Sequence, residues 1–160
     1  MDLILWRHAE AGDNLGEIDP VADLERPLKP KGERQAQRMA EWLNQFLPES
    51  TRVLTSPAAR CVQTAEVLGR RSKRVAALGP DGTVEGLLAS ARWPDSKEPV
   101  LIVGHQPTLG RVAAYLMAGE LALQAEPWSI KKGSVWWLRH RPRDDRAEVV
   151  IVAVRTAEGL

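Results

Sequence analysis

The sequence predicts a single-domain α/β fold with a mostly parallel central sheet, helices on both faces and an antiparallel edge. Short apolar runs typical of buried strands alternate with amphipathic stretches of helical period along most of the chain. Such alternation is typical of parallel sheets that are covered by helices. The last two strand-like segments follow each other with no helix between them, which predicts the antiparallel edge. A chain of 160 residues is expected to form one domain, 1–160.

The first half of the chain shows clear start and stop signals for its elements. Pro48 ends a run of apolar residues at helical spacing, and Ser56-Pro57 combines an N-cap with a first-turn proline. An acidic stretch broken by prolines follows the first strand, and loops of that length are usually functional. The expected elements are a strand at 3–6, a loop at 9–30, a helix at 31–47, a strand at 52–55 and a helix at 56–68.

The second half continues the alternation and then changes to strands alone. Gly79-Pro80-Asp81-Gly82 predicts a turn. Pro94 ends the helix expected at 83–93, and Gly119 ends the helix expected at 108–118. A charged stretch at 139–146 is expected to be the loop between the two last strands. The expected elements are a weak strand at 74–78, a helix at 83–93, a strand at 100–103, a helix at 108–118, and strands at 134–138 and 149–154.

Composition narrows the class of protein. The formal net charge is +1, which gives no electrostatic support for general nucleic-acid binding. The single cysteine, Cys61, excludes an intrachain disulfide framework and fits a reducing compartment. No signal peptide is visible, and no apolar stretch approaches the ~20 residues that span a bilayer. A cytoplasmic protein without membrane partners is therefore expected.

Three predicted strands end in residues suited to binding and attacking a phosphate. Arg7 and His8 follow the first strand, Arg60 lies about one turn into the helix after the second, and His105 follows the strand at 100–103. Because the carboxyl ends of parallel strands share one edge of a sheet, these side chains are expected to converge. Guanidinium groups can clamp phosphate oxygens with forked hydrogen bonds, and an imidazole can attack phosphorus.

The arginine charges are consistent with binding a phosphate and attacking it with a histidine. Nearby arginine charges favour the neutral imidazole, which is the nucleophilic form, whereas a bound phosphate favours the charged form. One histidine could therefore attack while the other donates a hydrogen bond to the developing charge. From the residues alone, either His8 or His105 could be the nucleophile.

Three motifs carry a family resemblance, which extends from Leu3 to about Gly119. Taken together they resemble the signatures of the histidine phosphatase superfamily. A further segment, Arg26-Pro27-Leu28 followed by Lys31-Gly32, is similar to the SixA-type phosphohistidine phosphatase branch of that superfamily. The three motifs are Arg7-His8-Ala9, Ser56-Pro57-Ala58-Ala59-Arg60 followed by Gln63-Thr64-Ala65, and Val103-Gly104-His105-Gln106-Pro107.

The resemblance implies a phosphoglycerate-mutase-like fold and a metal-independent phosphatase that needs no cofactor. It implies that His8 becomes phosphorylated, that Arg7, Arg60 and His105 complete the phosphate pocket, and that Arg26 binds near it. The implied substrate is phosphohistidine on a protein that takes part in signal transduction.

A proton donor for the leaving group is not fixed by any motif. Asp81 and Glu85 are the acidic residues between the second and third motifs, and Glu85 is favoured because it lies one turn into a predicted helix. A phosphorus–nitrogen bond needs less help from an acid. Two other functions stay open: a small-molecule phosphatase or mutase of the same superfamily, and a non-catalytic module that binds phosphorylated partners.

Overall fold

A computed structural model describes the chain from Met1 to Leu160, Gly159 excepted. Among the described residues, six strands form one sheet in the order β3-β2-β4-β1-β5-β6. Strands β1, β2, β3 and β4 are parallel, and β5 and β6 add an antiparallel edge next to β1. The strands are β1 (Asp2–Arg7), β2 (Arg52–Thr55), β3 (Ser72–Arg74), β4 (Val100–Gly104), β5 (Val135–Arg143) and β6 (Arg146–Arg155).

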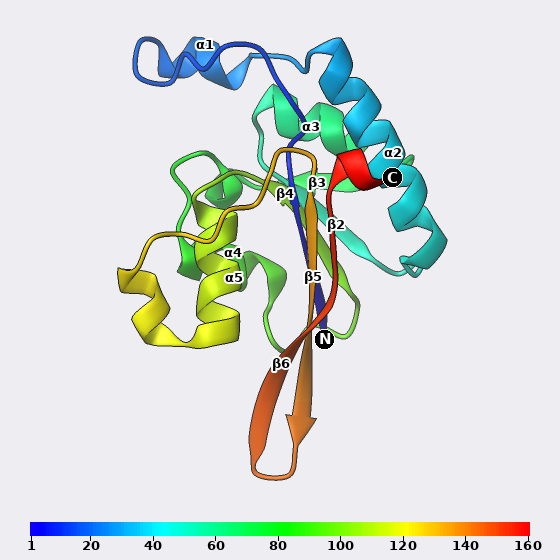
Figure 1. Ribbon diagram of the computed structural model, residues 1–160, viewed down its shortest axis with the longest axis vertical. Coiled ribbons are helices and arrows are strands. Elements are labelled where there is room, and N and C mark those ends of the chain that lie inside the picture. Colours follow the sequence, from blue (N-terminus) through cyan, green and yellow to red (C-terminus); the bar gives the residue numbers. More distant parts are fainter.

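Helices cover both faces of this sheet (Figure 1). Helices α2 and α3 pack on one face, and α4 and α5 pack on the other. No helix of the described residues is long and apolar enough to cross a membrane. The helices are α1 (Pro20–Leu24), α2 (Pro30–Phe46), α3 (Ala59–Glu66), α4 (Val84–Ala91) and α5 (Thr108–Ala118), with short 3₁₀ segments at Ala76–Leu78, Glu120–Gln124 and Ala157–Gly159.

The two central strands are the most deeply buried part of the molecule. All five residues of β4 and residues 3–6 of β1 are buried, because helices cover the sheet on both sides. Strands buried on both faces read as continuous apolar runs in the sequence. The predicted fold class is therefore confirmed, including the antiparallel edge.

Three local expectations differ from the structure. Residues 9–30 are not a plain loop, because Asp19 caps the short helix α1 by accepting a hydrogen bond from the Ala22 N–H. Strand β3 lies at 72–74, before the expected 74–78, and the 3₁₀ turn at Ala76–Leu78 follows it. Residues 139–143 continue β5, since the β5–β6 hairpin turns only at Asp144-Asp145.

Candidate active site

The sheet register brings the motif residues together at one edge. Arg7 of β1 pairs with Gly104 of β4, and Thr55 of β2 pairs with Val103 of the same strand. The backbone continues this alignment past the strand ends. The His8 N–H donates to the Gly104 carbonyl (3.1 Å), and the Ser56 N–H donates to the Val103 carbonyl (3.0 Å).

A polar cavity of about 600 Å³ opens at this edge. Chain segments from β1, the stretch before α2, helix α3 and the residues after β4 all contribute to its wall. The cavity is lined by the expected residues Arg7, His8, Arg26, Arg60, Asp81 and His105, and also by Asp23 and Lys132.

His8 is held in one tautomer. Its Nδ1 lies 2.8 Å from the Ala9 carbonyl oxygen, which can only accept, so Nδ1 carries the proton and Nε2 keeps its lone pair. The ring is buried. Burial, together with the charges of Arg60 and Arg7, lowers the pKa of His8 to about 3. His8 is therefore a neutral imidazole with a free nitrogen for nucleophilic attack.

His105 is held between a hydroxyl and a guanidinium. Its Nε2 lies 2.8 Å from Ser56 Oγ, and its Nδ1 lies 3.4 Å from Arg60 Nη2. Since the guanidinium only donates, Nδ1 accepts and the ring proton is on Nε2. Burial first, and then the charges of His8 and Arg60, lower the pKa of His105 to about 3. The ring centroids of His8 and His105 are 5.4 Å apart.

Two arginines keep unused donors at the cavity. Arg7 Nη1 donates to the Ile130 carbonyl (2.8 Å), and Arg60 Nη1 donates to the Asp23 carbonyl (2.9 Å). The Nε atoms of Arg7 and Arg60 are buried and have no hydrogen-bond partner among the described residues. A buried donor without a partner is costly and is an exception in folded proteins.

Asp23 is a cavity residue that sequence reasoning did not find. Its carboxylate lies 3.2 Å from Arg60 Nη2 and 3.0 Å from Arg26 Nε, and it accepts a hydrogen bond from the Leu15 N–H. The three-residue spacing between Asp23 and Arg26 was a signal for this pair, because such residues meet on a helical turn. The contact with Arg60, 37 residues away, left no signal in the sequence.

A family model described as the histidine phosphatase superfamily, branch 1, matches residues 3–80. Phosphohistidine phosphatase SixA of Escherichia coli (strain K12) is 32% identical over 129 residues, which cover 75% of this chain and 76% of that protein. The chain belongs to the histidine phosphatase superfamily. An uncharacterized protein of a Picosynechococcus species is 34% identical over 148 residues, covering 87% of this chain and 85% of the relative.

Similarity to a solved structure extends over the whole histidine phosphatase chain. The protein histidine phosphatase SixA complexed with tungstate superposes with a TM-score of 0.73 at 25% identity, and the match covers 99% of each chain. The architecture is thus the phosphoglycerate-mutase-like fold. Family membership and this likeness support phosphatase activity.

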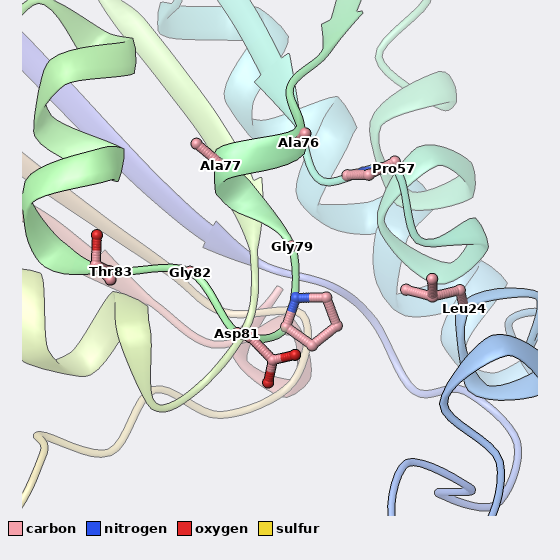
Figure 2. Close-up of a pocket in the computed structure, with 9 residues that line it drawn as sticks. Leu24, Pro57, Ala76, Ala77, Gly79, Asp81, Gly82 and Thr83 are labelled. Atoms are coloured by element: carbon pink, nitrogen blue, oxygen red, sulfur yellow. The ribbon is translucent and has the colours of Figure 1, made fainter.

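The two acidic residues that could act as a proton donor are placed differently in this histidine phosphatase. Asp81 lines the cavity from an exposed position on its rim, whereas Glu85 is exposed on α4 and is not among the lining residues. The structure therefore does not bring Glu85 to the site. Asp81 also lines a second, shallower hollow of about 420 Å³ that adjoins the first, between Leu24 and Pro57 on one side and Ala76 to Thr83 on the other (Figure 2).

Metal-ligating residues do not gather anywhere in the described part of the chain. No group of three or more His, Cys, Asp or Glu side chains there is arranged to hold a metal ion. The positive charge at the cavity comes from the guanidinium groups of Arg7, Arg26 and Arg60 and from the ammonium groups of Lys29 and Lys132.

Proposed function

We propose that this protein is a metal-independent phosphatase that transfers the phosphoryl group of its substrate to His8 and then to water. The observation that carries the proposal is that a neutral His8, whose Nε2 is free, lines the same cavity as the guanidinium groups of Arg7 and Arg60. A nucleophile and positive donors facing one cavity are what phosphoryl transfer requires, since this reaction depends mostly on positioning and charge stabilisation.

In the first step, the lone pair of His8 Nε2 forms a bond to phosphorus while the bond to the leaving group breaks. The electron pair of that bond stays with the leaving group, which is the dephosphorylated part of the substrate. Arg7 and Arg60 donate hydrogen bonds to the equatorial oxygens. The His8 Nδ1–H, fixed on the Ala9 carbonyl, stabilises the positive charge that develops on the phosphorylated ring.

In the second step, a water molecule attacks phosphorus and the bond to His8 Nε2 breaks. The electron pair returns to Nε2, inorganic phosphate leaves, and the neutral imidazole is restored. His105 supports both steps because a bound phosphate raises the proton affinity of its Nδ1, which can then donate to a phosphate oxygen. Ser56 allows this change, since its hydroxyl accepts from the Nε2–H of both the neutral and the charged ring.

The substrate that we propose is phosphohistidine on a protein. The likeness to phosphohistidine phosphatase SixA supports this choice. Of the two acids between the second and third motifs, Asp81 is exposed on the rim and Glu85 is not among the residues that line the cavity. A phosphorylated imidazole leaves more readily than an alkoxide, so it needs less protonation than a phosphoester does.

The test compares hydrolysis of a ³²P-labelled phosphohistidine protein with hydrolysis of phosphoserine, sugar phosphates and phosphoglycerates. We expect the highest kcat/KM for the phosphohistidine protein, full activity in a chelator, and an acid-labile label on the wild-type chain. His8→Ala should lose activity and label, whereas His140→Ala, which changes a histidine outside the cavity, should retain both. Binding without turnover, a chelator-sensitive activity or an active His8→Ala chain would overturn the proposal.

A further inference from the structure

We infer that Asp23 is a positioning residue that holds the guanidinium groups of Arg60 and Arg26 side by side at the cavity. This inference rests on the proposed function, because it gives Arg60 its use as a phosphate ligand. Asp23 is nearly fully buried, at 5% exposure, and it lines the same cavity as both histidines.

Asp23 contacts two of the three guanidinium nitrogens of Arg60. The backbone carbonyl of Asp23 accepts from Arg60 Nη1 (2.9 Å), and its carboxylate lies 3.2 Å from Arg60 Nη2. Nε is the nitrogen of Arg60 left without a partner among the described residues. A guanidinium is planar and rigid, so fixing two of its nitrogens also fixes the direction of the third.

The same carboxylate controls Arg26. Asp23 Oδ1 accepts from Arg26 Nε (3.0 Å), while Arg26 Nη1 donates to the Gly12 carbonyl. The guanidiniums of Arg26 and Arg60 lie 3.0 Å and 3.2 Å from the same carboxylate, so they are close enough to repel each other, and the charge of Arg26 adds to burial in lowering the pKa of Arg60. Asp23 lies between them and offsets this repulsion when no phosphate is present.

The position of Asp23 in the fold explains why its contacts with Arg60 are needed. Helix α1 extends away from the body of the molecule (Figure 1), and its apolar residues Val21 and Leu24 are exposed. Asp23 is the buried residue of α1, and none of the apolar residues of this helix is buried. The contacts of Asp23 with Arg60 therefore hold the 12–26 segment, which includes Arg26, against the cavity.

The substitution Asp23→Asn tests this role because it keeps the size of the side chain and removes its charge. We expect kcat for a small phosphoester to fall about 30-fold with KM within about threefold, since a misplaced donor weakens transition-state binding above all. The matched control is Asp19→Ala, which removes the same charge and also the cap of α1 without touching Arg60. It should keep kcat within about threefold of the wild type.

Anion binding separates positioning from a general structural role. Orthovanadate takes the five-coordinate shape of the transferring phosphoryl group, whereas inorganic phosphate does not. In Asp23→Asn, calorimetry should show vanadate affinity about tenfold weaker and phosphate affinity within about threefold, because losing a carboxylate also favours any anion. Asp23→Glu, which restores the charge, should recover about fivefold in kcat over Asp23→Asn.

Three results would overturn the inference: equal kcat in Asp23→Asn and the wild type, an equal loss in Asp19→Ala, or a parallel loss of vanadate and phosphate affinity. Thermal unfolding midpoints show whether each variant is folded. A wild-type chain that hydrolyses no phosphorylated compound would refute the proposed function instead, and the calorimetric comparison of the two anions would still decide the role of Asp23.

Discussion

His8 and His105 lie with their ring centroids 5.4 Å apart and their planes inclined by 60°. Their surroundings differ although the rings are close. The backbone carbonyl of Ala9 fixes the proton of His8, whereas the Ser56 hydroxyl and Arg60 hold His105. Nε2 of His8 is left free, whereas both ring nitrogens of His105 have partners, so the structure gives the two histidines different chemical capacities. The residues alone left the choice of nucleophile open, the family resemblance implied His8, and our proposal takes His8 as the nucleophile.

Replacing His105 should impair turnover without abolishing the covalent intermediate. His105→Gln is expected to lower kcat by about 100-fold, the usual cost of losing one donor to a developing charge. Rapid-quench experiments with labelled substrate should still detect acid-labile phosphate on the chain, in contrast to His8→Ala. Complete absence of label in His105→Gln, together with label in His8→Ala, would exchange the two roles.

Ser56→Ala tests whether the hydroxyl next to His105 matters for catalysis. The substitution removes the partner of His105 Nε2 and the acceptor of the Ala58 N–H (3.2 Å). We expect kcat to fall about tenfold and the acidic limb of its pH profile to shift. The reason is that His105 loses the hydroxyl that accepts the hydrogen bond from its Nε2–H. A pH profile identical to that of the wild type would show that Ser56 acts on the fold alone.

The buried histidines should make stability depend on pH. Both have a pKa lowered from 6.5 to about 3 in the folded state, so the unfolded chain binds more protons between these values. Stability is therefore fully present above about pH 6.5 and falls as the pH decreases toward 3, by up to about 1.4 kcal/mol per pH unit for each histidine. Urea unfolding at pH 7.5 and pH 5 measures the difference.

Histidine variants compared at pH 7.5 and pH 5 show whether His105 contributes to this loss of stability. His105→Gln should show a smaller loss of stability between pH 7.5 and pH 5 than the wild type, whereas His140→Ala, outside the cavity, should show the wild-type loss. Phosphate should reduce the loss, because a bound anion favours the charged imidazoles. A loss of equal size in all three chains would place its origin in other groups.

Gly32 lets α2 pack against the chain that follows His8. A Cβ there would lie 1.9 Å from the Glu10 carbonyl oxygen, so Gly32→Ala must move that backbone. We expect a loss of roughly 2–3 kcal/mol in the free energy of unfolding and a reduced kcat. Gly69→Ala is the control: Gly69 has a φ of +68° and open space around it, so its loss should be about 1 kcal/mol with kcat unchanged. Equal losses would contradict the packing argument.

Cys61 should be chemically inert although its Sγ lies 3.5 Å from His105 Nε2. The side chain is fully buried, and burial raises the pKa of its thiol to about 12. We therefore expect no alkylation by iodoacetamide at pH 8 in the native protein and complete alkylation in urea, measured by mass spectrometry. Cys61→Ala should retain kcat/KM within about threefold. Fast labelling of the native chain would show that the thiol is accessible.

The sequence predicted the parts of this molecule that depend on burial and on local signals. Strands β1 and β4 are continuous apolar runs because both of their faces are covered, and the residues after them form the cavity because the strands are parallel. His8, Arg7, Arg60 and His105 could therefore be brought together by topology alone.

The sequence could not predict features that depend on contacts between distant residues. Helix α1 has only five residues, and Asp23 is fixed by Arg60, which is 37 positions away. Strand β3 is short, exposed and highly charged, so it lacks the apolar pattern of a strand. The charged residues 139–143 extend β5 because cross-strand partners such as Glu148, 3.0 Å from Arg143, compensate their charge.

Strand β1 precedes its neighbours in the sheet by more than half of the 160 residues. It pairs with β4 at residues 100–104 and with β5 at residues 135–143, so most of its contacts span more than half of the chain. A nascent chain that has emerged from the ribosome only as far as α5 leaves one edge of β1 unpaired. The central strand of the sheet is therefore completed only by contacts of large sequence separation, which slow the folding of a domain.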